Sequence, residues 1–522
     1  MRLDTMQLAA ARVARGAGQI PVGVVDADEA GWLEIARTAR AERNRLVAMW
    51  GSEGVEGVEG AFAVNAAYEC DDGILWARIA TGRKPDAGGD YPDLVPMFPC
   101  AARMQRAIFD LTGLRARGAV DTRPWLNHGN WPADYFPLQK QATGVEAFES
   151  SEADYAFVQV AGDGVHEIAV GPIHAGIIEP GHFRFSVVGE KVLRLEERLG
   201  YVHRGVERLF ERTPASRGQR VAARIAGDST VAFSWAYCMA LEQACGVALS
   251  KRALRLRALL LERERVANHL GDLGALGNDA GFGFGLAQFS RLKEDWIREN
   301  ARTFGHRYLM DRIVPGGVAV DVRAEDAAVL AAQCERIERD VHVMRKIYDD
   351  QSGLQDRFLG TGRLDTTVVE HFGVRGMAAR ASGQTFDVRA NLRPAPYDDF
   401  AVVAASDARG DVAARVAVRF AEIDESLRVI RALLADLPEG PPAVDMTPAA
   451  APAQGVGWVE GWRGDVFVAL ELSPGDVIAR CHCHDPSWQN WPALEHAIIG
   501  NIVPDFPLIN KSFNLNYAGH DL

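Results

Sequence analysis

The chain has 522 residues, of which 48% are hydrophobic and 24% are charged. This length predicts more than one domain, and this composition excludes a disordered chain, a collagen-like chain and a small disulfide scaffold. The 57 Lys and Arg against 70 Asp and Glu give a net charge of −13, which argues against a nucleic-acid partner. Seven cysteines in so long a chain favour a reducing compartment, the cytoplasm.

No stretch of about 18 uncharged apolar residues occurs, which is the length that a membrane-spanning helix needs. The most apolar segments, 253–261 and 498–509, are too short or are broken by polar residues and prolines. We therefore expect a chain that does not span a membrane itself, although it can dock to a partner that does.

Residues 1–160 have the mixed pattern of a small α+β domain. Short β-type runs predict strands at 19–25, 61–68 and 73–79, and helices are expected at 31–49 and 95–112. Residues 124–149 are rich in Pro, Trp, Asn and Gly, which predicts a linker or an arm laid over the surface. We place the domain boundary near residue 160.

Residues 165–522 predict a second, mainly α-helical domain with small β elements. It opens with three β-type runs, at 165–170, 182–188 and 191–198. Apolar residues at three- and four-residue spacing then predict long packed helices, at 221–249, 252–276, 324–350 and 411–437. A stretch rich in Pro, Ala and Gly follows, and two further β-type segments are expected after it, at 458–471 and 476–484.

Two segments carry residues that suit proton chemistry. His174 ends a Gly-Pro-Ile-His turn, where an imidazole can act in catalysis, although a solvated or hydrogen-bonded loop histidine is the alternative. Arg204 and Glu207 lie three residues apart, so on a helix they would share a face and could pair. A paired, partly buried glutamate can relay protons, and the alternative is a surface ion pair of little energetic weight.

The Cys-His-Cys-His run at 481–484 is the densest group of metal-ligating residue types. On a strand, alternation sends both cysteines to one face and both histidines to the other, so the four cannot converge on one tetrahedral ion. We interpret these cysteines, and Cys238 and Cys245, as structural. The phosphate-loop, dinucleotide-binding, zinc-protease and serine-hydrolase motifs are absent from the sequence.

A series of short motifs then follows the order found in a known family. The motifs are Gly171–His174, Tyr201–Leu209, Arg224–Gly227, Pro315–Val318, Gly373–Gly383, Pro396-Tyr397, Arg463–Asp465 and Asp485-Pro486. With them, residues 165–522 resemble the large subunits of energy-converting, formate-hydrogenlyase-like nickel–iron hydrogenases and the 49-kDa-type subunit of complex I. Residues 1–160, through Arg103–Gly113 and Arg123–Lys140, are similar to the 30-kDa-type subunit of complex I. The resemblance implies an α+β domain fused to a hydrogenase-large-subunit-like domain.

The resemblance also implies where a nickel–iron centre would be held. Active relatives hold it with two C-x-x-C pairs, because soft thiolates suit these metals. Carried onto this sequence, the four positions are Ala226, Ser229, Ser487 and Asn490, and none of them has sulfur. We therefore expect the hydrogenase scaffold without its metal, and hydrogen activation is the least favoured interpretation.

In complex I, the equivalent cavity accepts a quinone headgroup beside a His–Asp pair. The matching positions here are His174 and Asp279, which implies a quinone-type or proton-relay pocket with His174, Arg204, Glu207 and Asp279 as its working residues. The chain would bind no metal or cluster itself. Its implied partners are an iron–sulfur small subunit, which carries the clusters, and antiporter-like and other integral membrane subunits.

Two hypotheses of different class follow. One is a peripheral subunit on the cytoplasmic side of the inner membrane, within an oxidoreductase complex related to formate hydrogenlyase and NADH:quinone oxidoreductase. The other is a non-catalytic structural subunit that assembles the complex. Turnover after substitution of the cavity residues discriminates between them.

Overall fold

The computed structural model describes residues 1–3, 12–14, 20–54, 61–82, 90–151, 155–175 and 178–522. Residue 19, where the first expected strand begins, lies outside these ranges. Within the described ranges, no helix is both long enough and apolar enough to cross a membrane. The predicted fold class, an α+β domain followed by a mainly α-helical domain with small β elements, is confirmed.

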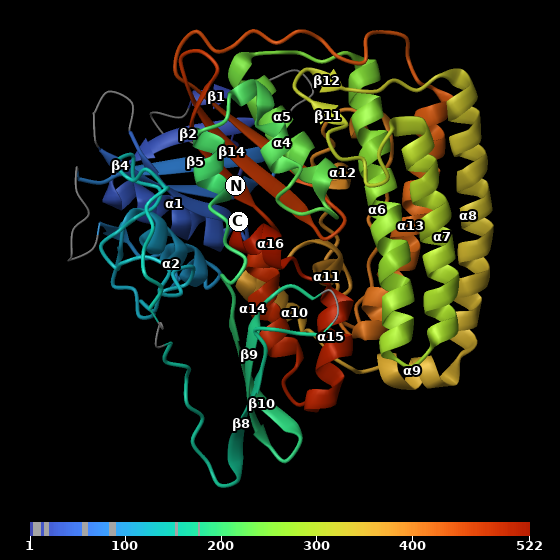
Figure 1. Cartoon of the computed structure of the whole chain (residues 1–522), viewed down its shortest axis with the longest axis horizontal. Coiled ribbons are helices and arrows are strands. Elements are labelled where there is room, and N and C mark those ends of the chain that lie inside the picture. The colour runs from blue at the N-terminus through green and yellow to red at the C-terminus, as the bar shows by residue number, and fades with distance from the viewer. Residues whose placement is uncertain (4–11, 15–19, 55–60, 83–89, 152–154, 176–177) are drawn as a thin grey trace.

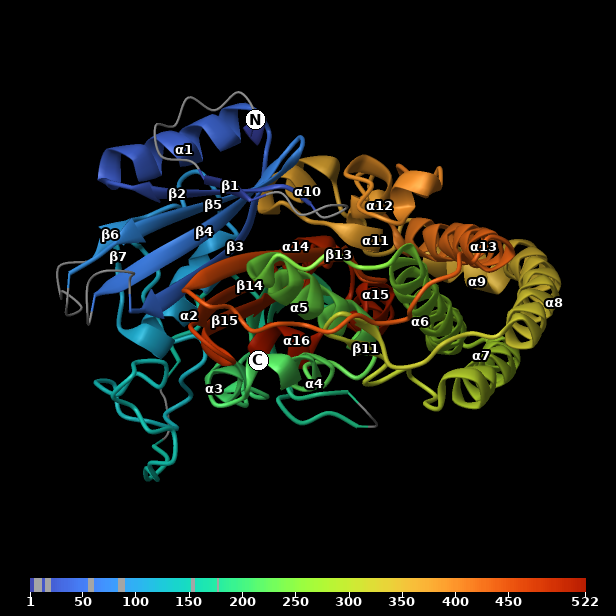
Figure 2. The same cartoon turned by 90° about the horizontal axis from the view of Figure 1, so that it is seen from above.

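The N-terminal domain is built on a five-stranded sheet with the order β1-β2-β5-β4-β3, in which only β2 and β5 run parallel. Figure 2 shows α1 along one face of this sheet. The remaining small elements of the domain are α2, which packs on β3, and the short pair β6 and β7. The bounds are β1 Arg12–Ala14, β2 Val22–Ala27, α1 Glu29–Ala41, β3 Leu46–Glu53, β4 Phe62–Cys70, β5 Gly73–Ala80, β6 Tyr91–Pro92, α2 Ala101–Thr112 and β7 Ala116–Arg117.

The prediction of a helix at 31–49 is wrong for the second half of that range. The helix α1 ends at Ala41, Arg43 adopts a left-handed φ of 60°, and Leu46 starts strand β3. The run from Leu46 to Trp50 is buried on both faces, between α2 and a second sheet, so it lacks the polar alternation that marks a strand in sequence. The helix α2 likewise starts later than expected, after Pro96 and Pro99.

The second domain opens with the three-stranded sheet β8–β10, which extends away from the body of the molecule (Figure 1). All three strands have the bounds expected from the sequence: β8 Val165–Val170, β9 His182–Val188 and β10 Lys191–Arg198. Short helices then lead into the core, namely α3 Val206–Glu211, α4 Gln219–Ala222 and α5 Thr230–Cys245.

Long helices form a bundle at one end of the molecule (Figure 1). Its members are α6 Lys251–Asp279, α7 Gly283–Phe304, α8 Ala324–Asp350 and α13 Val412–Ala435. Three of them were predicted, whereas α7, which starts in a glycine-rich stretch, was missed. Short elements connect the bundle to the core: β11 Ile313–Val314, β12 Gly317–Val318, α9 Ser352–Phe358, α10 Thr366–Phe372, α11 Gly376–Arg380 and α12 Val388–Asn391.

A sheet of three antiparallel strands, β13 Ala453–Glu460, β14 Asp465–Ser473 and β15 Val477–His484, joins the two domains. Trp458 and Phe467 of this sheet share a buried apolar cluster with Trp50 and Trp76 of the N-terminal sheet. The C-terminal helices α14 Ser487–Ala497, α15 Phe506–Phe513 and α16 Tyr517–Asp521 follow. The expected strand at 458–471 is in fact two strands with a turn between them, because Gly461 and Gly464 bracket a reversal.

The helix α5 lies directly on β13, and two glycines make this close approach possible. A Cβ at Gly455 or Gly457 would overlap the backbone carbonyl oxygen of Ala240 or Ala236. Since α5 begins just after Ser229, this contact fixes the position of the Ala226–Ser229 segment relative to the sheet.

We expect Gly457→Ala to lower the free energy of unfolding by about 3 kcal/mol, because the new methyl group forces α5 and β13 apart. Urea unfolding of the purified chain measures this. The control is Gly353→Ala in α9, where a Cβ meets no atom within 4 Å, and which should be neutral or stabilising by up to about 1 kcal/mol. Equal stability of the two variants would contradict the packing argument.

Candidate functional site: a charged central cavity

A cavity of about 760 Å³, here called the central cavity, lies between the start of α5, the C-terminal half of α6 and the segment that joins α15 to α16. Figure 1 shows α15 and α16 between the β8–β10 sheet and α6. Five cations and four anions line it: Arg204, Arg224, Lys293, Arg463, Lys511, Glu179, Asp228, Asp272 and Asp279. The wall is therefore strongly charged, and the charges nearly balance.

Two residues of the wall, Arg463 and Asp228, form a two-point ion pair. Arg463 donates from Nη1 to Asp228 Oδ1 at 2.9 Å and from Nη2 to Asp228 Oδ2 at 2.6 Å. Burial raises the pKa of Asp228, but the charge of Arg463 outweighs it and holds the pKa below its ordinary value. Asp228 is therefore a permanent anion, and Arg463 is held in place against the Trp462 ring, 4.0 Å from its centroid.

The four positions that the resemblance assigns to metal ligands offer no sulfur donor. Ala226 lines the cavity but has no donor. The Ser229 hydroxyl accepts from Arg463 Nη1 at 3.2 Å, and the Ser487 hydroxyl accepts from the Asn516 backbone N–H at 2.9 Å. The Asn490 amide bonds both the backbone N–H and the carbonyl of Arg375, each at 3.2 Å. Neutral, already bonded oxygens and an arginine do not fit a nickel–iron centre.

Ser487 and Asn490 do not line the central cavity. The segment that faces Ala226 across it is Asn514–Ala518, which the sequence analysis missed. No motif in the sequence marks this segment as part of a cavity wall. A Cβ at Gly519 would crowd the Asn516 amide and Asp485, so no larger side chain fits there unless they shift.

The structure does not bring His174 and Asp279 together. His174 Nε2 lies 2.7 Å from the Gly181 carbonyl and the ring packs near Phe183, outside the cavity wall. Asp279, at the end of α6, does line the cavity. Burial raises the pKa of Asp279 above its ordinary value, although Lys511 acts in the opposite direction, so Asp279 can take up a proton more readily than its neighbours.

Arg204 and Glu207 do not pair, contrary to the interpretation of their spacing. The helix α3 starts only at Val206, after Gly205 in a left-handed conformation, so Arg204 lies before the helix. Arg204 instead donates to the carbonyl of Ile225 at 2.8 Å, which places its side chain at the cavity wall.

Glu207 points into the protein, where it accepts from Arg480 at 3.1 Å and lies 2.7 Å from His482. Burial alone would raise the pKa of Glu207, but Arg480 and His482 lower it to about 2. A carboxylate that stays ionised at neutral pH is a fixed hydrogen-bond acceptor and does not carry protons itself.

The Cys-His-Cys-His run forms the end of strand β15 and alternates as expected. The Cys481 and Cys483 sulfurs lie 4.0 Å apart, and the His482 and His484 rings have centroids 5.9 Å apart. In the part of the chain that the structure describes, no group of three or more His, Cys, Asp or Glu could hold a metal ion. Burial raises the pKa of Cys483, so its thiol stays protonated.

Behind the cavity wall, a network of buried charges runs into the bundle. Asp272 accepts from Arg419 Nε at 3.0 Å, and His269, one turn away on α6, lies 2.7 Å from Glu422. Glu422 also accepts from Arg380 at 2.7 Å. Burial lowers the pKa of His269, opposed by its contact with Glu422, so its imidazole is a neutral group beside ionised ones.

Glu264 of α6 is the buried carboxyl closest in sequence to this network. It accepts the backbone N–H groups of Val231 at 2.7 Å and Ala232 at 3.2 Å, and so caps the start of α5. Burial raises its pKa to about 8, with these two hydrogen bonds acting in the opposite direction. At neutral pH it carries a proton that Asp228, an anion nearby, helps to retain.

Known proteins match both parts of the chain. Residues 279–456 match the family described as respiratory-chain NADH dehydrogenase, 49 Kd subunit, and residues 25–147 match the corresponding 30 Kd subunit family. Formate hydrogenlyase subunit 5 of Escherichia coli is 31% identical over 473 residues, covering 89% of this chain and 82% of that protein. The chain belongs to the family of formate hydrogenlyase subunit 5.

Hydrogenase-4 component G of Escherichia coli is 30% identical over 436 residues, covering 83% of this chain and 76% of that protein. An NADH-quinone oxidoreductase protein of Bacteroides thetaiotaomicron is 26% identical over 484 residues, covering 88% of this chain and 90% of that protein. Together with the two family matches, these relatives confirm the predicted fusion of 30-kDa-type and 49-kDa-type parts. They also agree with the predicted role, a subunit of a membrane-associated oxidoreductase complex.

A chain in the solved structure of the membrane-bound sulfane sulfur reductase, an archaeal respiratory membrane complex, shares the fold. The TM-score is 0.64 at 24% identity, with 69% of this chain and 99% of that chain covered. At this identity the likeness concerns the fold alone.

The raised pKa of Glu264 makes stability depend on pH. Glu264 binds a proton in the folded state and loses it in the unfolded state between about pH 4.5 and pH 8, so the free energy of unfolding falls as pH rises through this window. One carboxyl contributes a slope of at most about 1.4 kcal/mol per pH unit. Glu264→Gln should remove this slope, as urea unfolding between pH 5 and pH 8 would measure. Identical pH profiles for the wild type and the variant would contradict the assignment.

Proposed function

We propose that this chain is a metal-free, hydrogenase-like large subunit whose central cavity handles protons inside a membrane-associated oxidoreductase complex. The single observation that carries this proposal is the ion pair between Asp228 and Arg463. Asp228 lies just before α5, between Ala226 and Ser229, the two positions where the resemblance places metal-binding thiolates. Asp279 and Glu264 supply carboxyls with raised pKa values next to permanent charges, which is the environment of proton-transfer groups.

A quinone is the second candidate occupant of the central cavity. Its volume, about 760 Å³, suits a headgroup, and Lys293, Lys511 and Asn510 of its wall could hydrogen-bond a quinone oxygen. The charged wall and the position of His174 outside it favour proton transfer over quinone binding.

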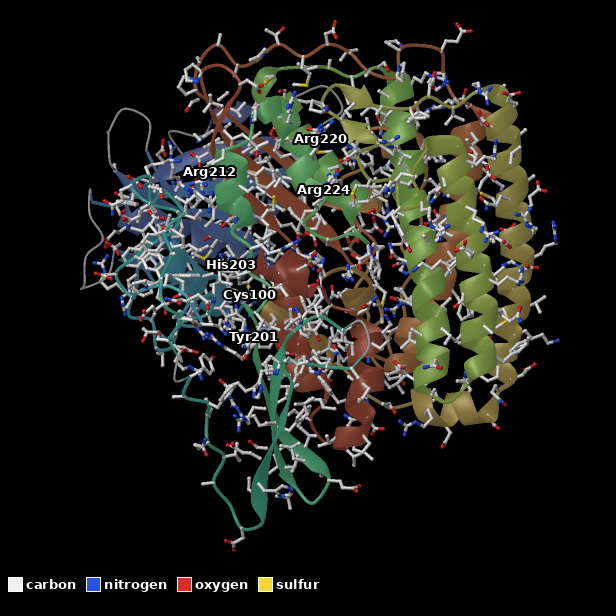
Figure 3. The ribbon with its side chains drawn as sticks, in the orientation of Figure 1. Cys100, Tyr201, His203, Arg212, Arg220 and Arg224 are labelled. Atoms are coloured by element: carbon white, nitrogen blue, oxygen red, sulfur yellow. The ribbon has the colours of Figure 1, made fainter. Side chains whose placement is uncertain are left out.

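The partners that we propose are an iron–sulfur small subunit, which carries the clusters, and integral membrane subunits, including antiporter-like ones. Exposed arginines near the cavity support a partner with an acidic surface. Figure 3 shows Arg220 and Arg224 near each other and Arg212 farther away. Arg212, Arg217 and Arg220 are exposed, whereas Arg224 is already paired with Asp311. We place the chain peripherally, on the cytoplasmic side of the inner membrane.

Nickel analysis of the purified complex tests the metal-free assignment. Because the described wall offers no sulfur donor and Arg463 brings a positive charge, we expect nickel well below one atom per chain by mass spectrometry. Iron is not informative, since partner clusters contain it. Stoichiometric nickel would overturn the proposal.

Substitution of Asp279 tests whether the cavity works. We expect Asp279→Asn to reduce the turnover of the complex by about 10²-fold, the usual effect of losing a proton-transfer group. Turnover is measured in membranes that hold the assembled complex, as the rate at which reduced methyl viologen is oxidised. The matched control is Asp424→Asn: the pKa of Asp424 is also raised, but Asp424 lies outside the cavity, beside His342.

The two hypotheses predict different outcomes for these variants. If the cavity handles protons, the Asp279→Asn complex turns over more slowly than the wild type, whereas the Asp424→Asn complex turns over at the wild-type rate. Both complexes must assemble as well as the wild type. A purely structural subunit predicts equal turnover for both variants and the wild type.

A further inference from the structure

A second cavity, of about 520 Å³, lies where the two domains meet and is here called the interdomain cleft. Figure 2 shows α10 and the elements after it beside the sheet of the N-terminal domain. Residues of the N-terminal domain and of the segment after α10 line it, chief among them Arg40, Arg43, Arg45, Glu69, His371 and Arg375. It shares no lining residue with the central cavity.

The cleft has an excess of positive charge. Four arginines and two glutamates, Glu69 and Glu370, line it. Arg40 and Arg43 are exposed and make no side-chain ion pair within the described residues. Arg40 lies in the last turn of α1, and Arg43 lies two residues after the helix ends. Of the carboxylates in the lining, only Glu370 remains to offset these two guanidiniums, so the cleft keeps an excess of positive charge that suits an anion.

Two further guanidiniums crowd onto one carboxylate oxygen. Arg45 Nε donates to Glu69 Oε2 at 2.8 Å, and Arg375 Nη2 donates to the same oxygen at 2.6 Å. Arg45 also pairs with Asp465. Burial and then the charge of Arg375 lower the pKa of Arg45 to about 10, so the two cations repel each other even with Glu69 between them.

Arg375 is held in a fixed plane and has a donor to spare. Its guanidinium lies 4.6 Å from the centroid of the Phe386 ring, and its Nε is buried with no hydrogen-bond partner among the described residues. A buried donor without a partner costs about 1–3 kcal/mol, which a bound acceptor would recover.

We propose that the interdomain cleft binds a phosphate-bearing small molecule. A phosphate group is an anion with three acceptor oxygens, which suits the positive charge of the cleft and the arginine forks. The cleft is far larger than one phosphate and falls within the usual range of small-ligand sites, so the ligand has an organic or second phosphate part. The neutral side chains of Gln384, Thr385 and Asn391 would contact that part.

Calorimetric titration of the full chain, in a phosphate-free buffer at low salt, tests this with three probes: inorganic phosphate, pyrophosphate and ADP. We expect pyrophosphate or ADP to bind with a Kd below about 1 mM and more tightly than inorganic phosphate, and added salt to weaken binding. A stronger signal with ADP than with pyrophosphate identifies a nucleotide, and the reverse identifies a compact polyphosphate.

The double variant Arg40→Gln/Arg43→Gln should weaken binding by about tenfold or more while the fold is retained, because both side chains are exposed. The matched control is Arg37→Gln, on the same helix and 62% exposed but outside the cleft, which should bind as the wild type does. Arg375→Lys keeps the charge but loses the planar fork, and should also weaken binding. The proposal is overturned if none of the probes binds at about 1 mM, or if the double variant and Arg37→Gln bind equally.

Discussion

The ion pair between Asp228 and Arg463 holds together three segments that are far apart in the sequence. Asp228 precedes α5, Arg463 lies in the turn between β13 and β14, and Arg463 Nε also donates to the carbonyl of Asn514 before α16. Arg463 is buried, whereas the Asp228 side chain is 40% exposed, so solvent screens the pair and water can partly replace a lost partner. The Arg463 side chain therefore ties the three segments together at the wall of the central cavity.

An interior this rich in charge is stable only if each ion is paired, and the contacts around Asp272, Glu422 and Arg419 meet this condition. Paired ions have pKa values far from neutrality and cannot exchange protons easily. The groups that can are the exceptions: Asp279 and Glu264, whose pKa values burial raises, and His269, whose pKa burial lowers. The proton transfer that we propose is thus confined to a few positions within a fixed electrostatic frame.

Much of the fold could be predicted from the sequence because the local spacing of apolar residues specifies its helices and strands. The strands β8 to β10 and the helix α8 have the predicted bounds, and α6 and α13 differ by a few residues. Periodicity fails where burial is two-sided, as in β3, or where glycines begin a helix, as in α7. The family motifs identified the scaffold, and they located Ala226 and Asp279 on the cavity wall.

The remaining features depend on tertiary contacts that no local pattern records. Arg204 and Glu207 have helical spacing, yet a left-handed Gly205 separates them, and their true partners lie as far away as Ala518 and Arg480. Ser487 and Asn490 follow a family motif, but the cavity wall is completed by Asn514–Ala518. The interdomain cleft shows the same principle most clearly: its arginines come from both domains, 330 positions apart between Arg45 and Arg375, so only the packing of the fused domains creates the site.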